Sequence, residues 1–474
     1  MRARQSQALA AAFAIRLLLV FLVFVQWGPC LQEGDSQSWM YGSLGLALGR
    51  PGMYQPSFFW PPLFKLLAAG LFKGFGFSIV MIKAVETLLG LAGIALAYRL
   101  ALRLYGASAA FVCALLVALL PIGATLSLSG LAEPLYLVLM EIFFLAYLDE
   151  REERDWRLHA AAAGAMALAV VTRYEALGFY AAFAALEARR FLRRRGPRSP
   201  ARLAAAVLAP AAVFLLWVGV YSPNFDDPFF WFRVTRADNA AGYLHGLGPA
   251  ALVAYVVAHA WWGYSWFCLA VPAAIAGLWA GAEPRAVPSA RMLTAAGLGG
   301  MAALFATTAV RLLSSDAART LYVPFVLLMP GAAFLLARAG ERCRRALPKA
   351  ASAGAAALLA GVFAWHCGGM ASERGWCFPD DGGASSDACE VGGTLRRIAR
   401  RREAAERSMA CRAASGDFSC SSAVVCSGLA ALAERPPQSP PEAAFYVIGP
   451  CARANGALLA RAGRECLTQK GAPR

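Results

Sequence analysis

Charged residues are scarce in this chain of 474 residues. They make up 16% of it, while hydrophobic residues make up 59% and the mean hydropathy is +0.52. A typical soluble domain is roughly 25% charged and about 45–50% apolar. The composition therefore excludes a soluble globular enzyme, a disordered protein and a fibrous repeat. Because about 20 apolar residues span a bilayer, we expect a multi-pass membrane protein.

Familiar catalytic motifs are also absent. The sequence has no phosphate-binding glycine loop, no nucleophile elbow and no His-Glu-x-x-His pair. It shows no internal repeat, and no inverted-repeat symmetry of the kind found in many secondary transporters. The function therefore has to be sought in single polar residues at the membrane surface, where ionisable side chains are costly and usually functional.

Long apolar runs predict a polytopic all-α membrane protein with about 11 transmembrane helices. The runs are 8–26, 79–98, 107–126, 131–148, 157–172, 174–188, 202–221, 260–281, 292–313, 320–338 and 349–367. The first run follows a short basic stretch and is interpreted as an uncleaved anchor. Within it, Arg16 is expected to extend toward the cytoplasmic interface.

The positive charges predict the orientation. The chain has 45 lysine and arginine residues against 29 aspartate and glutamate residues, a net charge of +16. The basic residues cluster in every second loop between the apolar runs, and thus on one side of the membrane, which favours membrane topology over nucleic-acid binding. The positive-inside rule then predicts a plasma (inner) membrane protein with a cytoplasmic N-terminus. An odd number of spans places the C-terminal tail outside.

The chain is expected to have two domains. Residues 1–369 would form the transmembrane domain, with a long first outer loop at 27–78, and residues 370–474 a small α/β or α+β extracytoplasmic domain. Eight of the 12 cysteines lie between Cys367 and Cys466, which predicts disulfides in an oxidising compartment and leaves their pairing open. Within the tail, 443–449 is expected to be a buried strand and 456–463 the start of a helix.

The first outer loop contributes three candidate residues, Asp35, Tyr41 and Lys65. The loop is long and rich in aromatic residues and proline, so it is expected to be ordered and functional. Asp35 directly follows the first span, as a carboxylate at the outer surface. It is either a site residue or an ordinary solvated aspartate.

The other outer loops add further ionisable residues. Glu133 precedes Pro134 and either complements a helix dipole or serves in a site. Arg173 and Glu175 occupy a very short loop, as a structural ion pair or as site residues. Arg319 lies with Tyr322 in the fifth outer turn, as an interfacial anchor or as part of a site. Arginine binds phosphate through a fork of donors, and a carboxylate can act as a general base.

The order of these residues resembles the GT-C membrane glycosyltransferases, which use polyprenyl-phosphate sugars. The most similar branches are the bacterial relatives of protein O-mannosyltransferases and the lipid A aminoarabinose transferase. The resemblance covers roughly residues 8–340 and is carried by Asp35 with Tyr41, Pro61-Pro62-Leu63, Ala132-Glu133-Pro134, Thr172-Arg173-Tyr174-Glu175 and Arg319-Thr-Leu-Tyr322-Val-Pro-Phe325.

This resemblance implies a hexosyltransferase of GT-C type. It would transfer a single sugar with inversion from a polyprenyl-phosphate donor to a lipid, glycan or protein acceptor on the outer face. Asp35 would be the catalytic base and Glu133 a second catalytic carboxylate, and these two could hold a divalent metal. Asp35 is followed by Ser36, where many members have a second acid, which leaves metal use open. The implied substrate-binding residues are Lys65, Arg173, Glu175, Arg319, Tyr322 and Tyr41.

A polytopic transporter or lipid-sugar flippase is the alternative function. Such a protein would place ionisable residues near the bilayer midplane. Glu86 and Glu141 are the main acidic residues within the predicted spans, and they are expected to pair across helices. Substrate flux without a covalent product would distinguish this alternative from the enzyme.

Overall fold

The protein is described by a computed structural model. The structure describes residues 2–27, 34–49, 60–153, 155–193, 199–221, 264–279, 287–309, 317–346, 445–450, 457–462 and 465–470, and the single residues 251, 254 and 257. The helices are α1 (Arg2–Trp27), α2 (Gly34–Ala47), α4 (Leu63–Phe75), α5 (Ile79–Tyr105), α6 (Ala107–Leu119), α7 (Pro121–Leu126), α8 (Glu133–Glu153), α9 (Trp156–Val170), α10 (Ala176–Arg193), α11 (Ser199–Tyr221), η3 (Ser265–Leu269), α14 (Ala270–Trp279), α15 (Val287–Ala309), α16 (Ala317–Thr320) and α17 (Tyr322–Ala346).

Local sequence signals set several helix boundaries. The Ser78 hydroxyl caps α5 by accepting a hydrogen bond from the Met81 N–H at 3.2 Å. Gly106, with φ of 84°, separates α5 from α6. Pro121 occupies the first turn of α7, where a missing N–H costs nothing. Asp155 caps α9 by accepting from the Arg157 N–H at 2.9 Å.

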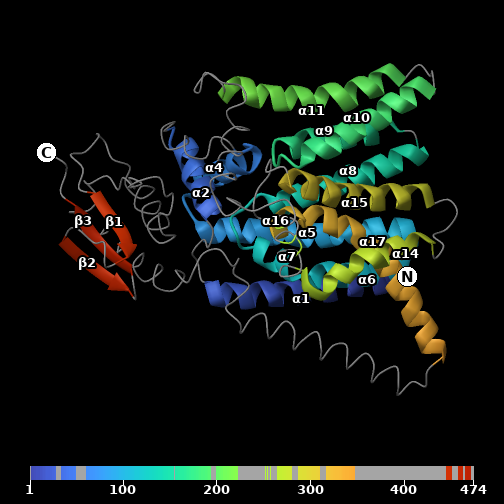
Figure 1. Cartoon of the computed structure of the whole chain (residues 1–474), viewed down its shortest axis with the longest axis horizontal. Helices are drawn as coiled ribbons and strands as arrows, with labels where there is room; N and C mark the ends of the chain where they lie inside the picture. The colour runs from blue at the N-terminus through green and yellow to red at the C-terminus, as the bar shows by residue number, and fades with distance from the viewer. Residues whose placement is uncertain are drawn as a thin grey trace.

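The described part of the chain is a helical bundle with α17 at its centre. In Figure 1, α17 lies among α5, α6, α14 and α15, against all of which it packs. Four described helices are long and apolar enough to cross a membrane: Ser6–Val25, Ile79–Tyr105, Pro200–Val220 and Tyr322–Arg342. The most apolar window of the last is 67% buried, against 22% and 17% in the spans of α1 and α11.

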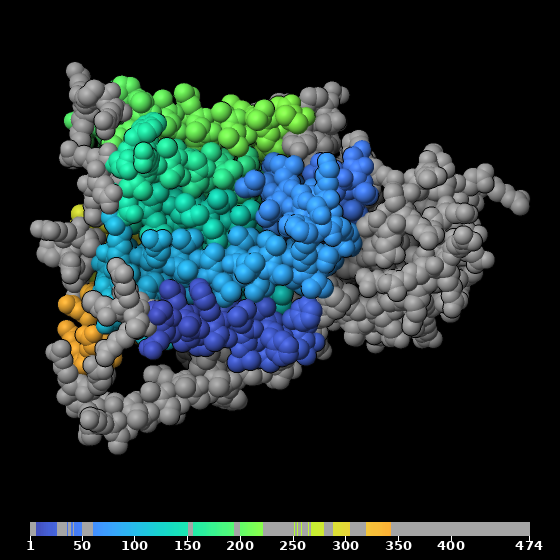
Figure 2. Space-filling model, turned by 180° about the vertical axis from the view of Figure 1, so that it is seen from behind, coloured from blue at the N-terminus to red at the C-terminus, as the bar shows by residue number. Residues whose placement is uncertain are grey.

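Helices α1 and α11 form opposite edges of the bundle, as Figure 2 shows. Each presents large apolar side chains outward. Phe21 of α1 is 60% exposed, and Leu216 of α11 is 67% exposed. Continuous exposed apolar surface of this kind suits contact with lipid rather than with water. The bundle therefore has the character of a membrane protein, as the composition predicts.

The apolar runs from 8–26 to 202–221 fall on helices, with local differences. The run 107–126 is divided between α6 and α7, because Leu120 leaves the helical conformation before Pro121. The run 349–367, and parts of 260–281 and 292–313, lie outside the described residues. The first outer loop contains α2 and α4, which lie together at one end of the bundle (Figure 1) and meet through Trp39 and Phe64, with ring centroids 5.6 Å apart.

The expectation for Arg16 is wrong. Its side chain does not extend to an interface: it is 1% exposed, and its Nη2 donates to the carbonyl of Val117 in α6. The guanidinium lies beside Gly123, which has no side chain to exclude it. Arg16 thus bonds to a neighbouring backbone instead of reaching a headgroup, because α1 packs against α6 and α7 along this side.

The tail contains a three-stranded antiparallel sheet in the order β1-β3-β2, made of β1 (Phe445–Pro450), β2 (Ala457–Ala462) and β3 (Glu465–Lys470). The strand expected at 443–449 is confirmed by β1. The helix expected to begin within 456–463 is wrong, since this segment forms β2. Its alanine and leucine residues favour a helix locally, but pairing with β3 decides the outcome. The tail's other residues lie outside the described part.

Candidate functional site

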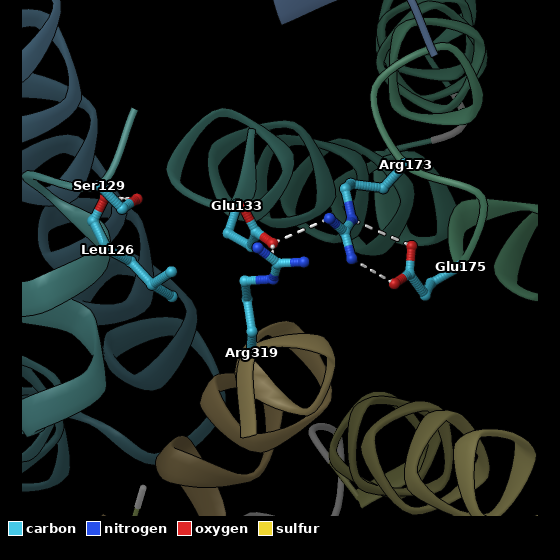
Figure 3. Close-up of polar contacts among 6 residues, drawn as sticks. All are labelled: Leu126, Ser129, Glu133, Arg173, Glu175 and Arg319. Carbon is cyan, nitrogen blue, oxygen red and sulfur yellow. Dashed lines mark hydrogen bonds and ion pairs between the residues drawn. The ribbon is translucent and has the colours of Figure 1, made fainter. Parts of the chain in front are cut away.

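A buried cluster of ionisable residues joins three segments that are far apart in the sequence. Glu133 is the first residue of α8 and is 2% exposed. Its Oε1 accepts a hydrogen bond from Arg173 Nη1 at 2.8 Å and lies 3.0 Å from Arg319 Nε. Figure 3 shows the two guanidinium groups approaching the Glu133 carboxylate from the α9–α10 turn and from α16.

The turn between α9 and α10 fixes the direction of Arg173. The backbone N–H of Arg173 donates to the Ala169 carbonyl at 3.0 Å, and this hydrogen bond continues the last turn of α9. Its guanidinium forms a fork with Glu175, in which Nε lies 3.1 Å from Oε2 and Nη2 lies 2.6 Å from Oε1 (Figure 3). Such a bidentate pair is geometrically specific. The pair with Glu175 leaves the Nη1 of Arg173 directed at Glu133.

The electrostatics of the cluster keep Arg173 charged. Burial alone lowers the pKa of its guanidinium, but the carboxylates of Glu133 and Glu175 raise the pKa above its ordinary value despite the nearby Arg319. Two arginines and two glutamates balance in formal charge. Within the described part of the chain, Glu133 Oε2 has no hydrogen-bond partner. A buried ion cluster contributes little net stability, so its position favours a functional role.

Lys65 of α4 lies in a neighbouring aromatic region. Its side chain is fully buried, its Nζ donates to the carbonyl of Trp60 at 2.9 Å, and it stands 6.0 Å from the centroid of the Trp39 ring. Burial lowers the pKa of Lys65 well below its ordinary value. Trp60 stacks on Tyr174 with centroids 6.4 Å apart. This stacking connects the first outer loop to the turn that carries Arg173.

The remaining predicted residues fall in two places. Asp35 and Tyr41 belong to α2, one turn before and just after Trp39, and their side chains lie outside the described residues. Tyr322 is 2% exposed, and its hydroxyl and the Arg16 guanidinium both border Gly123. The structure thus places Tyr322 beside Arg16, and it brings Glu133, Arg173, Glu175 and Arg319 together.

The surroundings of Glu133 do not suit a divalent cation. Two guanidinium groups already lie within 3.0 Å of one carboxylate oxygen, and their positive charge opposes a second cation there. No group of three or more His, Cys, Asp or Glu residues that could hold a metal occurs in the described ranges. We therefore derive no chemical step through a metal at Glu133.

Sequence reasoning missed two residues near the cluster. Trp60 carries no charge and gives no signal beyond its place in an aromatic loop. Glu86 was noticed only as an acid within an apolar span, and it was expected to pair across helices. Its Oε2 instead accepts a hydrogen bond from the Gly130 N–H at 2.9 Å, in the loop just before Glu133. An acid inside an apolar helix was the only available signal for this contact.

Part of the chain matches the model of a known protein family. Residues 60–217 match the model of the dolichyl-phosphate-mannose-protein mannosyltransferase family, a segment that contains Lys65, Glu133, Arg173 and Glu175. A comparison with curated proteins finds no significant match. One similar solved structure is ArnT from Cupriavidus metallidurans bound to undecaprenyl phosphate. It has a TM-score of 0.53 and 17% identity, over 90% of this chain and 75% of that one.

A second similar structure is the archaeal oligosaccharyltransferase AglB from Archaeoglobus fulgidus, in complex with an inhibitory peptide and a dolichol-phosphate. Its TM-score is 0.51 at 13% identity, over 84% of this chain and 58% of that one. At these identities the likeness concerns the fold. Together with the family match, it confirms the resemblance inferred from the sequence: the chain has the fold of the GT-C superfamily of membrane glycosyltransferases.

Proposed function

We propose that the protein is an inverting glycosyltransferase that moves a single sugar from a polyprenyl-phosphate donor to an acceptor hydroxyl. The observation that carries this proposal is the buried pair of arginines held by Glu133 within a GT-C fold. ArnT and AglB, which share the fold, have been solved with undecaprenyl phosphate and with a dolichol-phosphate. A lipid-linked phosphate is thus the ligand class best supported.

The proposed reaction is a single displacement. The acceptor hydroxyl attacks the anomeric carbon, the bond from that carbon to the phosphate oxygen breaks, and its electron pair leaves with the polyprenyl phosphate. Asp35 takes the proton from the acceptor hydroxyl as general base. The phosphate gains one negative charge as it leaves. Arg173 and Arg319 stabilise that charge, because preorganised cations act most strongly where charge develops.

Glu133 has a definite part in this scheme. Without donor, its carboxylate compensates two buried guanidinium groups that would otherwise repel one another. Glu175 holds Arg173 from the other side. The arginines are therefore oriented before the donor arrives, which avoids much of the cost of ordering them on binding. Lys65 and Tyr41 would complete the donor site from the first outer loop, and Tyr322 would border it.

The topology belongs to the same proposal. About 11 spans in residues 1–369, with a cytoplasmic N-terminus in the inner membrane, place the Glu133 cluster and the tail on the outer face. Residues 370–474 would form a disulfide-bonded α/β or α+β domain that contributes to binding a lipid, glycan or protein acceptor. The three antiparallel strands are consistent with such a domain.

Transfer of a radiolabelled sugar tests the function. Membranes containing the protein would be given polyprenyl phosphates that carry different hexoses or aminoarabinose, and labelled product would be measured. Asp35→Asn should lower kcat by about 1,000-fold, since a general base contributes roughly 100- to 10,000-fold. Asp149→Asn is the matched control, because Asp149 pairs with Arg103 near the end of α8 remote from Glu133.

One outcome would contradict the role of Asp35, and a different outcome would contradict the transferase function. Unchanged transfer by Asp35→Asn would remove Asp35 from the mechanism and leave the transferase function intact. Uptake of the lipid-linked sugar into proteoliposomes, without covalent product from any donor, would instead support a transporter or flippase. Arg16, Lys83, Glu86 and Glu141, all at most 2% exposed within the bundle, are the residues on which that alternative would depend.

A further inference from the structure

The loop between α7 and α8 determines where Glu133 lies. Ser127 and Ser129 donate to carbonyls of the preceding turn, Gly123 at 2.7 Å and Leu126 at 3.0 Å; Figure 3 includes the second contact. These short-range bonds close the end of α7, but they do not fix the loop relative to the rest of the bundle. Contacts from another helix must do so.

Helix α5 makes those contacts at two points. Glu86 Oε2 accepts from the Gly130 N–H at 2.9 Å. The Thr87 hydroxyl donates to the Lys83 carbonyl at 2.8 Å and shares its proton with the Ser127 carbonyl at 3.3 Å. One turn after Glu86, Gly90 lets the loop approach closely, because an added Cβ would stand 2.6 Å from Ser127 Oγ. The loop is therefore held along one face of α5 from its first residue to Gly130.

The hydrogen bond from Gly130 to Glu86 maintains the backbone conformation at Gly130. Gly130 has a φ of 79°, which places it in the left-handed region that favours glycine. The chain turns there, and Glu133 follows three residues later as α8 begins. A hydrogen bond at this position thus controls the direction in which the chain enters α8.

The cost of burying Glu86 suggests that this contact is important. Its side chain is completely buried, and an acid inside an apolar span is expensive. The Gly130 N–H gives one Glu86 oxygen a hydrogen-bond partner inside this apolar surrounding. Glu86 also interacts electrostatically with Lys83, one turn earlier in α5, and with Glu133. Glu86 therefore lies within reach of the cluster without belonging to it.

We propose that Glu86 is a positioning residue: by holding the Gly130 N–H, it fixes the start of α8 so that Glu133 meets both Arg173 and Arg319. The inference rests on the proposed function for its effect on activity, but its structural part can be measured independently. No contact between Glu86 and the substrate is required.

Two substitutions at one site separate the hydrogen bond from the carboxyl group. Glu86→Gln keeps an oxygen that can accept from Gly130, whereas Glu86→Ala removes the acceptor. In the sugar-transfer assay, Glu86→Ala should lower kcat/KM for the donor by about 100-fold, the effect expected when a site is misplaced by roughly 1 Å. Glu86→Gln should lose less than about tenfold, since a weaker hydrogen bond remains.

Hydrogen exchange of the intact protein gives the second readout. Peptides covering 127–133 should exchange faster in Glu86→Ala than in the wild type and should stay protected in Glu86→Gln. Glu141→Gln is the matched control, because Glu141 is also fully buried but lies on α8 away from the loop. It should leave exchange at 127–133 unchanged.

The results distinguish the possible failures. Unchanged exchange at 127–133 in Glu86→Ala would overturn the positioning role. Equal loss of activity in both variants, with protection kept in Glu86→Gln, would also overturn it and would assign the Glu86 carboxyl group to the chemistry. If the wild type transfers no sugar from any donor, the proposed function fails, and the exchange measurement alone still decides the role of Glu86.

Discussion

Arg319 Nε lies 3.0 Å from the same Glu133 oxygen that accepts a hydrogen bond from Arg173 Nη1. One carboxylate thus holds two guanidinium groups from separate segments of the chain. Each arginine alone could be a structural ion pair or an interfacial anchor. Their meeting at a buried glutamate makes a preorganised anion site the better interpretation, since a phosphate would find two fixed cations there.

Arg319→Met tests this interpretation. The variant retains the Glu133–Arg173 pair but leaves one buried negative charge uncompensated, so the unfolding temperature should fall. In the protein that remains folded, kcat/KM for the donor should fall by about 100-fold or more through loss of one stabilising cation. Transfer assays and thermal unfolding in detergent would measure the two effects. Arg103→Met is the control, because Arg103 forms a partly exposed pair with Asp149. Equal activities in the two variants would contradict the role of Arg319.

The helices were predictable because hydropathy is a local property of the sequence. The apolar runs at 79–98 and 202–221 became α5 and α11 with boundaries set by neighbouring caps and prolines. The same local reasoning failed at 456–463, where pairing with β3 overrides helix propensity. It also failed for Arg16, whose partner is a carbonyl of a different helix.

The site was predictable only as separate candidates. Glu133, Arg173 and Arg319 were identified because charge is rare in short outer loops and costly near the bilayer. That they would share one oxygen depends on how α8, the α9–α10 turn and α16 pack, which no single segment encodes. The bond from Glu86 to Gly130 was unpredictable for the same reason, since a backbone donor leaves no mark in the sequence.

Lys65 should make donor binding sensitive to pH. Burial lowers its pKa well below the ordinary value of about 10.4, so the ammonium loses its proton as pH rises through that lowered pKa. If the charged form binds the donor phosphate, KM for the donor should increase over this range. Lys65→Arg stays charged, and its KM should remain flat in the same titration. Identical pH profiles would exclude Lys65 from phosphate binding.

A rise in pH should stabilise the fold through Lys65, although it weakens donor binding. Between the lowered pKa and about 10.4 the unfolded chain binds the proton more readily than the native protein, so stability rises with pH across that window. Lys65→Met should flatten this rise, as measured by thermal unfolding at several pH values. A slope equal to that of the wild type would show that burial does not shift the titration of Lys65.

Gly130→Ala should weaken the fold and the site together. At a φ of 79° an L residue costs about 1–2 kcal/mol, and relief of that strain would move the start of α8. Both unfolding temperature and transfer activity should therefore fall. Gly164→Ala is the matched control: Gly164 lies inside α9 with open space around an added Cβ, and alanine there should stabilise by about 0.5–1 kcal/mol. A Gly130 variant as active and stable as this control would contradict the argument.

Gly90→Ala should displace the loop between α7 and α8 by a change in the neighbouring helix α5. An alanine Cβ would stand 2.6 Å from Ser127 Oγ but 3.7 Å from Ser127 Cβ, so the hydroxyl alone creates the conflict. The single variant should lose stability and transferase activity, but less stability than the about 1–3 kcal/mol of an overpacked core, because alanine suits the interior of α5 better than glycine by about 0.5–1 kcal/mol. Adding Ser127→Ala should restore most of both, because the remaining contact is of ordinary van der Waals length. If the double variant is no better than Gly90→Ala in unfolding and transfer assays, then close packing of α5 against the loop does not position Glu133.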